Sequence, residues 1–340
     1  MQTPTMSEPL ESAAPLPGHW RRGSTLVLRE AGIGIALLVL VAVFAALSPI
    51  FLTASNITNI FTQISINIIL AVGMTFVILI GGIDLSVGSV MALCAVVAGT
   101  ALKVEGLSEP AAIGLAALAS VGVGALCGLA NGAISAAWSI PSFIVTLGML
   151  NVARGAALQW TQARTIYEFP DAFNEFGTAT FAGIPALFLV ALLLVAIGWF
   201  VLNRTVFGRL VYAIGNNEEA VRLAGHPVKA IKVAAFVIAG VAVGIGAVVY
   251  MARLTIASPI VGIGFELNAI AAVIIGGTSL SGGRGSIIGT LLGACIIGVL
   301  ANGLILIGMS DFLRQMVTGA VIILAVILDV VRARLTRRTA

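Results

Sequence analysis

Apolar and polar residues alternate along this chain in long blocks, and the apolar blocks dominate. A helix needs about 20 consecutive apolar residues to cross the hydrocarbon core of a bilayer, and shorter apolar segments are typical of broken or re-entrant helices. Most blocks are near that length and several fall short of it. The pattern predicts about ten membrane spans, over residues 31–47, 64–80, 87–102, 111–137, 143–158, 184–202, 233–251, 267–282, 286–307 and 312–331.

These spans place the chain in the all-α class, as a polytopic bundle of transmembrane helices in which some helices are broken or re-entrant. We expect an N-terminal tail over residues 1–30, a membrane domain over 31–331 and a basic tail over 332–340. The longest polar linker inside the membrane domain covers residues 203–232.

Composition supports this class and excludes a soluble globular protein. Of the 340 residues, 59% are hydrophobic and only 9% are charged, whereas soluble domains carry about 25% charged residues. The three cysteines, Cys94, Cys127 and Cys295, lie inside apolar blocks and form no CxxC or Cys/His cluster. We therefore expect neither a metal site nor a disulfide.

The distribution of Lys and Arg predicts the orientation in the membrane, because cytoplasmic segments carry an excess of both. The loop 159–183 holds one arginine against three acidic residues, so we place it outside. With about ten spans, both termini are then cytoplasmic. The segments placed inside hold Arg21, Arg22, Arg29, Arg204, Arg209, Arg222, Lys229, Lys232, Arg332, Arg334, Arg337 and Arg338.

One carboxylate, that of Asp84, lies between two apolar blocks in the string IGGIDLSVGS of residues 80–89. A carboxylate at bilayer depth costs at least a few kcal/mol, so it needs a partner or a buried polar site. A similar string, IGGTSLSGG, recurs at residues 275–283. Matching interruptions in the two halves of a membrane protein indicate a transport path. The alternative is a pair of tight turns between adjacent spans.

Small residues spaced by four predict close contacts between helices, because they let two backbones approach. Ser281, Gly285, Gly289 and Gly293 form such a ridge. The pairs Gly128 with Gly132 and Gly240 with Gly244 repeat the pattern. We interpret these ridges mainly as packing surfaces.

The linker 203–232 contains the pattern of a short capped helix over residues 218–225. Asn216 or Asn217 is suited to cap its beginning, and Gly225 is suited to end it. Such a helix in the cytoplasm can dock into a cleft of a partner protein, and the alternative is a solvated or membrane-surface loop. The docking candidates are Glu218, Glu219, Ala220, Arg222 and Gly225.

The string Leu280–Arg284, LSGGR, is similar by eye to the signature of ABC ATPases. However, the chain contains no GxxxxGK[ST] phosphate-binding loop. We therefore expect that the chain does not bind ATP, is not an enzyme and has no cofactor.

Three separated strings carry a family resemblance: GGIDLSVGS, FGRLVYAIGNNEEAVRLAG and LNAIAAVIIGGTSLSGGRGSIIGTLLGA. They closely resemble the permease subunits of bacterial ABC importers of the ribose/xylose/arabinose type, and the resemblance extends from about residue 35 to 330. It implies a homodimeric permease in the bacterial inner membrane that carries a monosaccharide inward by alternating access. It also implies two partners, a periplasmic sugar-binding protein and an ATPase with two nucleotide-binding halves.

Polar side chains at the depth of the spans are the candidates for a path, because amides and hydroxyls exchange hydrogen bonds with a neutral sugar. Hydrogen bonding between helices is the alternative role for each of them. The candidates are Asn67, Asp84, Ser86, Asn131, Asn151, Asn268, Thr278, Ser279 and Asn302.

Three other functions stay open at this point. Asp84 would suit an ion-gradient-driven secondary transporter, although such a protein has no use for a docking helix. An intramembrane enzyme would need a catalytic constellation at span depth, whereas His19 and His226 both lie in polar segments. A permease for another solute, such as branched-chain amino acids or an autoinducer-like sugar derivative, is the nearest alternative.

Overall fold

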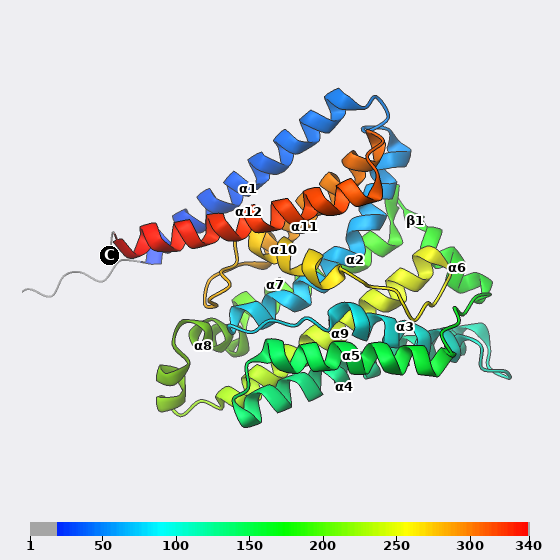
Figure 1. Ribbon diagram of the computed structural model, residues 1–340, viewed down its shortest axis with the longest axis horizontal. Coiled ribbons are helices and arrows are strands. Elements are labelled where there is room, and N and C mark those ends of the chain that lie inside the picture. Colours follow the sequence, from blue (N-terminus) through cyan, green and yellow to red (C-terminus); the bar gives the residue numbers. More distant parts are fainter. Residues whose placement is uncertain (1–18, 339–340) are drawn as a thin grey trace, which may run out of the picture.

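The computed structural model describes the backbone of residues 19–338 and the side chains of residues 30–327 (Figure 1). These residues form twelve helices and one short hairpin. In chain order the elements are α1 (His19–Leu47), α2 (Ala54–Leu79), α3 (Val87–Leu102), α4 (Glu109–Trp138), α5 (Ser142–Thr161), α6 (Asp171–Thr178), β1 (Thr180–Phe181), β2 (Ile184–Pro185), α7 (Ala186–Arg204), α8 (Val206–Leu223), α9 (Val228–Leu254), α10 (Phe265–Ile275), α11 (Ile287–Leu306) and α12 (Asp311–Arg338).

The helical class predicted from the apolar blocks is confirmed, and each predicted span coincides with one of these helices. Within the part of the chain that the structure describes, six helices are long and apolar enough to cross a membrane: α1, α2, α4, α7, α9 and α11. The helices α3 and α10 are apolar but shorter. α10 ends at Ile275 rather than near residue 282, because a glycine pair follows it. The count of ten spans therefore stays a prediction.

The predicted boundaries of the two tails, at residues 30 and 332, fall within helices, and as domain boundaries they stay predictions. α1 begins at His19, so residues 19–30 are its first turns, while residues 1–18 lie outside the described part of the chain. At the other end, α12 continues to Arg338.

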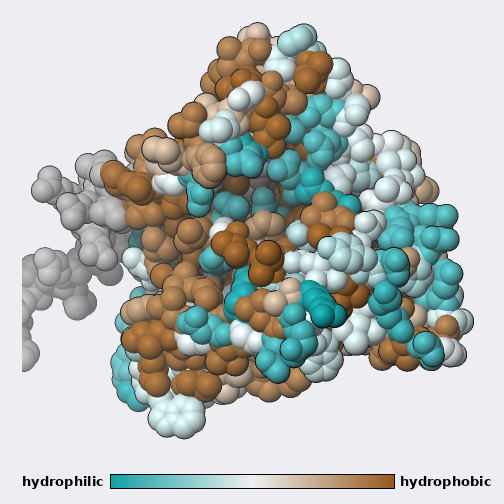
Figure 2. All heavy atoms as spheres, turned by 45° about the vertical axis from the view of Figure 1, so that its right-hand side comes forward, coloured by the Kyte–Doolittle hydropathy of each residue, from teal (hydrophilic) through white to brown (hydrophobic). Residues whose placement is uncertain are grey.

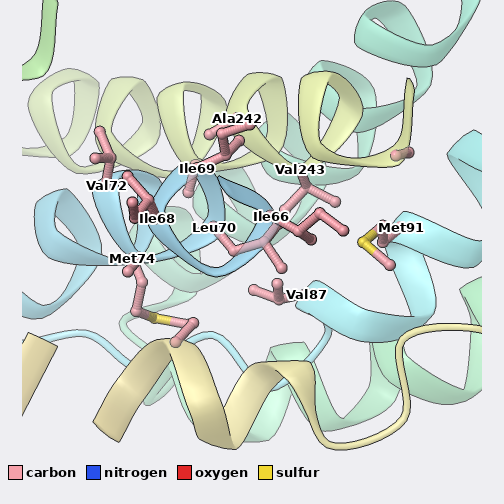
Figure 3. Packing of buried hydrophobic residues seen from close by; sticks show 14 of the residues in the cluster. Ile66, Ile68, Ile69, Leu70, Val72, Met74, Val87, Met91, Ala242 and Val243 are labelled. Atoms are coloured by element: carbon pink, nitrogen blue, oxygen red, sulfur yellow. The ribbon is translucent and has the colours of Figure 1, made fainter. Parts of the chain in front are cut away.

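Helix α2 lies at the centre of the bundle, because its apolar side chains point in all directions and must be covered on all sides. Figure 3 shows Ile69 of α2 toward Ala242 of α9, and Ile66 toward Met91 of α3. Met74, on another side of α2, reaches toward α10. In contrast, α4 exposes Leu118 and Leu126, which are 74% and 65% exposed, as expected of a lipid-facing surface.

The predicted contact through small residues holds α4 against α9. A Cβ atom added at Gly124 would overlap the carbonyl oxygen of Gly240, and one added at Gly240 would overlap that of Gly124. The Ser120 hydroxyl donates to the Gly244 carbonyl oxygen at 2.8 Å. Close packing of this kind joins helices where hydrophobic burial gives no driving force.

The two ends of the bundle carry different elements. Helix α8 and the C-terminal end of α12 lie at the left of Figure 1, and α6 and the β1–β2 hairpin lie at the right. The space-filling view brings the right-hand end forward and shows polar residues gathered there, beside broad hydrophobic surfaces (Figure 2). The elements predicted to be inside and those predicted to be outside are thus at opposite ends.

Candidate functional site

Two helices of the bundle, α2 and α10, end at glycines in the same way. Gly81 and Gly277 have φ values of +77° and +85°, which glycine adopts without strain. At each end two crossed backbone hydrogen bonds close the last turn: Gly81 N and Gly82 N donate to Ile78 O and Val77 O, and the N–H groups of residues 277 and 278 donate to the carbonyls of residues 274 and 273. This pattern is the Schellman motif.

The alignment of the two sequences and the alignment of the two turns differ by one residue. In the sequences Gly81 corresponds to Gly276, whereas in the structure Gly81 and Gly277 occupy the same position of the turn. After the turn the segments also differ. Residues 82–86 run without helical structure to the beginning of α3, while residues 278–286 fold into a compact loop in which Ser279 N donates to Arg284 O at 2.8 Å.

The segment 82–86 is supported by hydroxyl groups of α5. Ile83 N donates to Ser142 Oγ at 2.9 Å, and Leu85 N donates to Thr146 Oγ1 at 3.1 Å. Backbone donors that leave a helix at membrane depth need such partners, because lipid supplies none. Ser142 and Thr146 are one helical turn apart, which places both hydroxyls on the same face of α5.

Asp84 lies in a buried polar cluster at the beginning of α3. Its Oδ1 accepts hydrogen bonds from Ser86 N at 2.8 Å and from Ser86 Oγ at 2.6 Å. Asn131 of α4 donates to Ser86 Oγ at 3.0 Å, and its own Oδ1 has no partner among the described residues. The ion pairs found among the described side chains do not include Asp84. The carboxylate is therefore held by neutral donors.

Ser89 has a different partner from the one its position suggests. It is close to Asp84 in sequence, but its hydroxyl donates to the Ser86 carbonyl oxygen at 2.8 Å. The hydroxyl thus stabilises the first turn of α3 rather than the carboxylate.

Helices α3 and α10 both begin near the middle of the bundle and run toward opposite ends (Figure 1). Gly88 in the first turn of α3 meets Gly262, just before α10, and neither position has room for a Cβ atom. Glu266 of α10 accepts from Gly264 N at 3.2 Å. Arg154 of α5 clamps the same segment by donating to Pro259 O and Val261 O at 2.6 and 2.9 Å. Two half-length helices thus begin beside each other, and a carboxylate accompanies each.

The glycine turns themselves also touch. Gly283 N donates to Leu79 O at 2.9 Å, which joins the loop after α10 directly to the end of α2. A Cβ atom added at Gly282 would lie 2.9 Å from both Gly81 N and Leu79 O. The two interruptions, about 200 residues apart in the sequence, therefore form one unit.

The structure brings together only some of the polar residues predicted for a path. Asp84, Ser86 and Asn131 share one cluster, whereas Thr278 is buried beside Gly285 with no partner for its hydroxyl among the described residues. Asn302 lies apart, paired through two side-chain hydrogen bonds of 3.0 Å with Asn56. The other candidates, Asn67, Asn268 and Ser279, are half-buried, and Asn151 is exposed.

The ridge of α11 lies against α10. A Cβ atom at Gly289 would overlap the Gly276 carbonyl oxygen, and one at Gly293 would overlap that of Ala272. Gly285, just before α11, has no room for a Cβ atom because of the Thr278 side chain. These three residues hold the short α10 and its loop close to α11.

The predicted short helix is the second part of α8. Asn217 has non-helical backbone angles, and its Oδ1 caps the second part by accepting from Ala220 N at 3.0 Å. Gly225, at φ +82°, ends it with the same Schellman pattern. Glu219 and Arg222 pair with each other at 2.6 Å, and Glu218 pairs with Lys232 at 2.6 Å. Glu218, Glu219, Ala220, Arg222 and Gly225 are all exposed.

Several residues that hold this region were not predicted. Arg154 could have been found as a charge inside an apolar block, which is rare without a functional or structural role. Glu266 lies one residue before the predicted span 267–282. Because a full span was expected there, the sequence did not indicate that Glu266 lies at the beginning of a half-length helix. Ser142, Thr146 and Asn56 have partners far along the chain, and no local pattern marks them.

Comparison with protein families matches residues 56–326 to the family described as branched-chain amino acid transport system / permease component. The ribose import permease protein of Escherichia coli (strain K12) is 42% identical over 299 residues, covering 87% of this chain and 92% of that protein. The D-allose transport system permease protein of the same strain is 39% identical, covering 86% and 89%. The L-arabinose ABC transporter permease protein of Azospirillum brasilense is 34% identical, covering 96% and 95%. No solved structure matches the chain.

Proposed function

The chain belongs to the family of branched-chain amino acid transport system permease components, and from this premise we propose that it is the membrane-spanning permease subunit of an ABC importer for a monosaccharide. The proposal covers inward transport of a pentose or hexose across a bacterial inner membrane by alternating access. Hydrolysis of ATP takes place on a separate partner subunit.

The observation that carries the proposal is the agreement of three relatives over nearly the whole chain. Their names specify ribose, D-allose and L-arabinose, and each relative is 34% to 42% identical to this chain. All three substrates are neutral monosaccharides, although the name of the family refers to branched-chain amino acids. The relatives therefore favour a sugar over an amino acid.

The geometry supports a path beside the two half-length helices. In transporters, substrates bind where interrupted helices leave backbone groups and polar side chains near the bilayer midplane. Here the Asp84, Ser86 and Asn131 cluster lies at the beginning of α3, and Glu266 lies at the beginning of α10. We propose that the path passes this region, with Asn67, Asn268, Thr278 and Ser279 as further candidates. For Asn302 the pairing with Asn56 favours a role between helices.

The end that carries α8 is proposed to face the cytoplasm and to bind the ATPase. Its second part presents two acidic residues and Arg222 to solvent, together with Leu223, which is 78% exposed. The opposite end, with α6 and the hairpin, is proposed to face a periplasmic sugar-binding protein. A second copy of the chain completes the proposed permease.

Sugar uptake by cells tests this function. Cells that carry the chain with the ATPase and binding protein of its own transport system are given radiolabelled ribose, D-allose, L-arabinose or leucine. Matched cells lack only this chain. We expect accumulation of at least one sugar that depends on the chain. Chain-dependent accumulation of leucine with no accumulation of any of the sugars would replace the proposed function by the amino-acid alternative.

A further inference from the structure

Helix α8 is divided into two arms by the kink at Asn217, and the arms have different surroundings. The first arm, residues 206–216, packs against the bundle with Gly208, Val211 and Ile214 buried. The second arm, residues 218–223, is exposed apart from Val221, and its Glu218 pairs with Lys232 of α9. Along α8, the kink at Asn217 is the connection through which a protein bound to the exposed second arm can act on the first arm.

The first arm ends directly on the unit formed by the two glycine turns. A Cβ atom added at Gly215 would overlap the carbonyl oxygen of Leu79 at the end of α2 and the backbone nitrogen of Gly283. Those two groups are hydrogen-bonded to each other at 2.9 Å. Three backbones thus meet at one point with no side chain between them. Protein interiors packed this closely transmit a displacement rather than absorb it.

Two side chains of the first arm fasten the loop after α10 to α8. The Tyr212 hydroxyl donates to Gly285 O at 3.0 Å. Asn216 Nδ2 donates to Gly283 O at 3.1 Å and to Tyr212 O at 2.8 Å. Burial, with a smaller contribution from the Glu30 carboxylate, raises the pKa of Tyr212 to about 12. The phenol therefore keeps its proton at physiological pH and remains a donor.

We propose that Tyr212, Gly215 and Asn216 form a seat through which α8 positions both glycine turns, so that a partner bound to the second arm moves the ends of α2 and α10 together. This inference rests on the proposed function and goes beyond it, because it assigns transmission to the first arm rather than to the docking residues. The three are positioning residues, and the turns that they hold connect to the Asp84 cluster and to α10.

Chemistry explains why both turns move as one unit. The Gly283 N–H group donates to Leu79 O at the end of α2, and the Gly283 carbonyl oxygen accepts from Asn216 of α8. The backbone of Gly283 therefore links both helices. A shift of the first arm pulls the loop 278–286 through Gly283 and Gly285, and the loop carries Leu79 with it. The structure has the seat fastened, and a partner that binds better to a released arrangement would shift the equilibrium toward it.

The variant that tests the seat combines Tyr212→Phe with Asn216→Ala, which removes the fastening hydrogen bonds and leaves the second arm and its Asn217 cap unchanged. The matched control combines Tyr167→Phe with Asn203→Ala. Tyr167 lies near the opposite end, and Asn203 of α7 makes a similar bond to its own helix, donating to Trp199 O at 2.9 Å. Each permease is reconstituted in liposomes with its ATPase and binding protein.

The first measurement is the amount of sugar taken up per ATP hydrolysed. We expect this ratio to fall about tenfold in the seat variant, because two hydrogen bonds are removed from the coupling. Co-purification of the ATPase and the ratio of the control should not change. A seat with only a structural role would lower the amount of assembled complex and leave the ratio unchanged, and that result would overturn the inference.

The second measurement separates this inference from the proposed function. Hydrogen exchange of the permease alone reports on the Gly283 N–H group, which is bonded to Leu79 O. We expect faster exchange over residues 279–286 in the seat variant and in Tyr212→Phe alone, which serves if the double variant folds poorly. Unchanged exchange would refute the seat even if transport is confirmed. An unmodified complex that transports no sugar would refute the proposed function instead.

Discussion

Replacing Asp84 by Asn or by Leu separates the roles of its shape and its charge. Asn keeps an acceptor oxygen for the Ser86 N–H and hydroxyl groups, which lie 2.8 and 2.6 Å from Asp84 Oδ1. Its new amide group can donate to Asn131 Oδ1, which is buried and has no partner among the described residues. Leu offers no acceptor, so the Ser86 N–H group is left unpaired.

The magnitude follows from that unpaired group. A buried donor without an acceptor costs about 1–3 kcal/mol, so the Leu variant should be less stable than the Asn variant by about this amount. A hydroxyl hydrogen can rotate to another acceptor whereas an N–H group is fixed, so the Ser86 N–H group sets the expected difference. Both variants lose the buried carboxylate, so its desolvation cost cancels in this comparison. That cost enters only the comparison with the unmodified protein, where we expect the two charge-assisted hydrogen bonds of Asp84 to offset it.

Thermal unfolding of the purified protein in detergent measures this difference. The unmodified protein and Asp84→Asn should have similar midpoints of thermal unfolding, and the midpoint of Asp84→Leu should be several degrees lower. Asp171→Asn and Asp171→Leu serve as controls, because this exposed residue in the first turn of α6 should tolerate both. A Leu variant as stable as the Asn variant would refute the reasoning. Transport should be weakened already in Asp84→Asn, because the charge beside α3 is lost.

Three further perturbations test other parts of the account. The double variant Glu219→Lys with Arg222→Glu exchanges two charges but keeps the ion pair between these residues, so the second arm should stay folded. The amount of co-purified ATPase should fall about tenfold or more. An unchanged amount would show that this surface does not contact the ATPase. In a cysteine-free background, a cysteine at Asp171 should react with an impermeant thiol reagent added to spheroplasts, and one at Ala224 should not; the reverse pattern would invert the proposed orientation. Gly289→Leu should prevent folding, because the leucine side chain would overlap the backbone at the end of α10. Gly114→Leu is the control, since a side chain there meets open space and the protein should fold normally. Similar yields of both folded variants would contradict the close packing of α10 and α11.

The features predicted well from sequence are those set by neighbouring residues. Apolar blocks predicted the helices, because burial in lipid depends on the composition of each segment. A cap at Asn216 or Asn217 and a stop at Gly225 were predicted from residue type and spacing; the hydrogen bonds identify Asn217 as the cap and confirm the stop. The glycine pairs predicted interruptions after α2 and α10, where the structure has Schellman turns.

The features missed depend on partners far along the chain. Asn302 pairs with Asn56 across 246 residues, and no local pattern distinguishes that role from a place in a path. The similar strings at residues 80–89 and 275–283 predicted matching interruptions, whereas their structures differ after the turn. The N–H groups of the first segment donate to hydroxyls of α5, while Ser279 N donates to Arg284 O within its own loop. Likewise, Gly215 reads as an ordinary residue of a polar linker until α2 and the loop after α10 are placed against it.

Uptake of sugar by proteoliposomes tests the central claim most directly. The purified permease is reconstituted with its ATPase, the binding protein and labelled sugar are added outside, and ATP or ADP is enclosed inside. We expect accumulation that requires both the ATPase and ATP and that persists when a protonophore dissipates the proton gradient. Accumulation by the permease alone, driven by an imposed ion gradient without ATP, would contradict it and identify an ion-coupled transporter in which Asp84 carries the coupling ion.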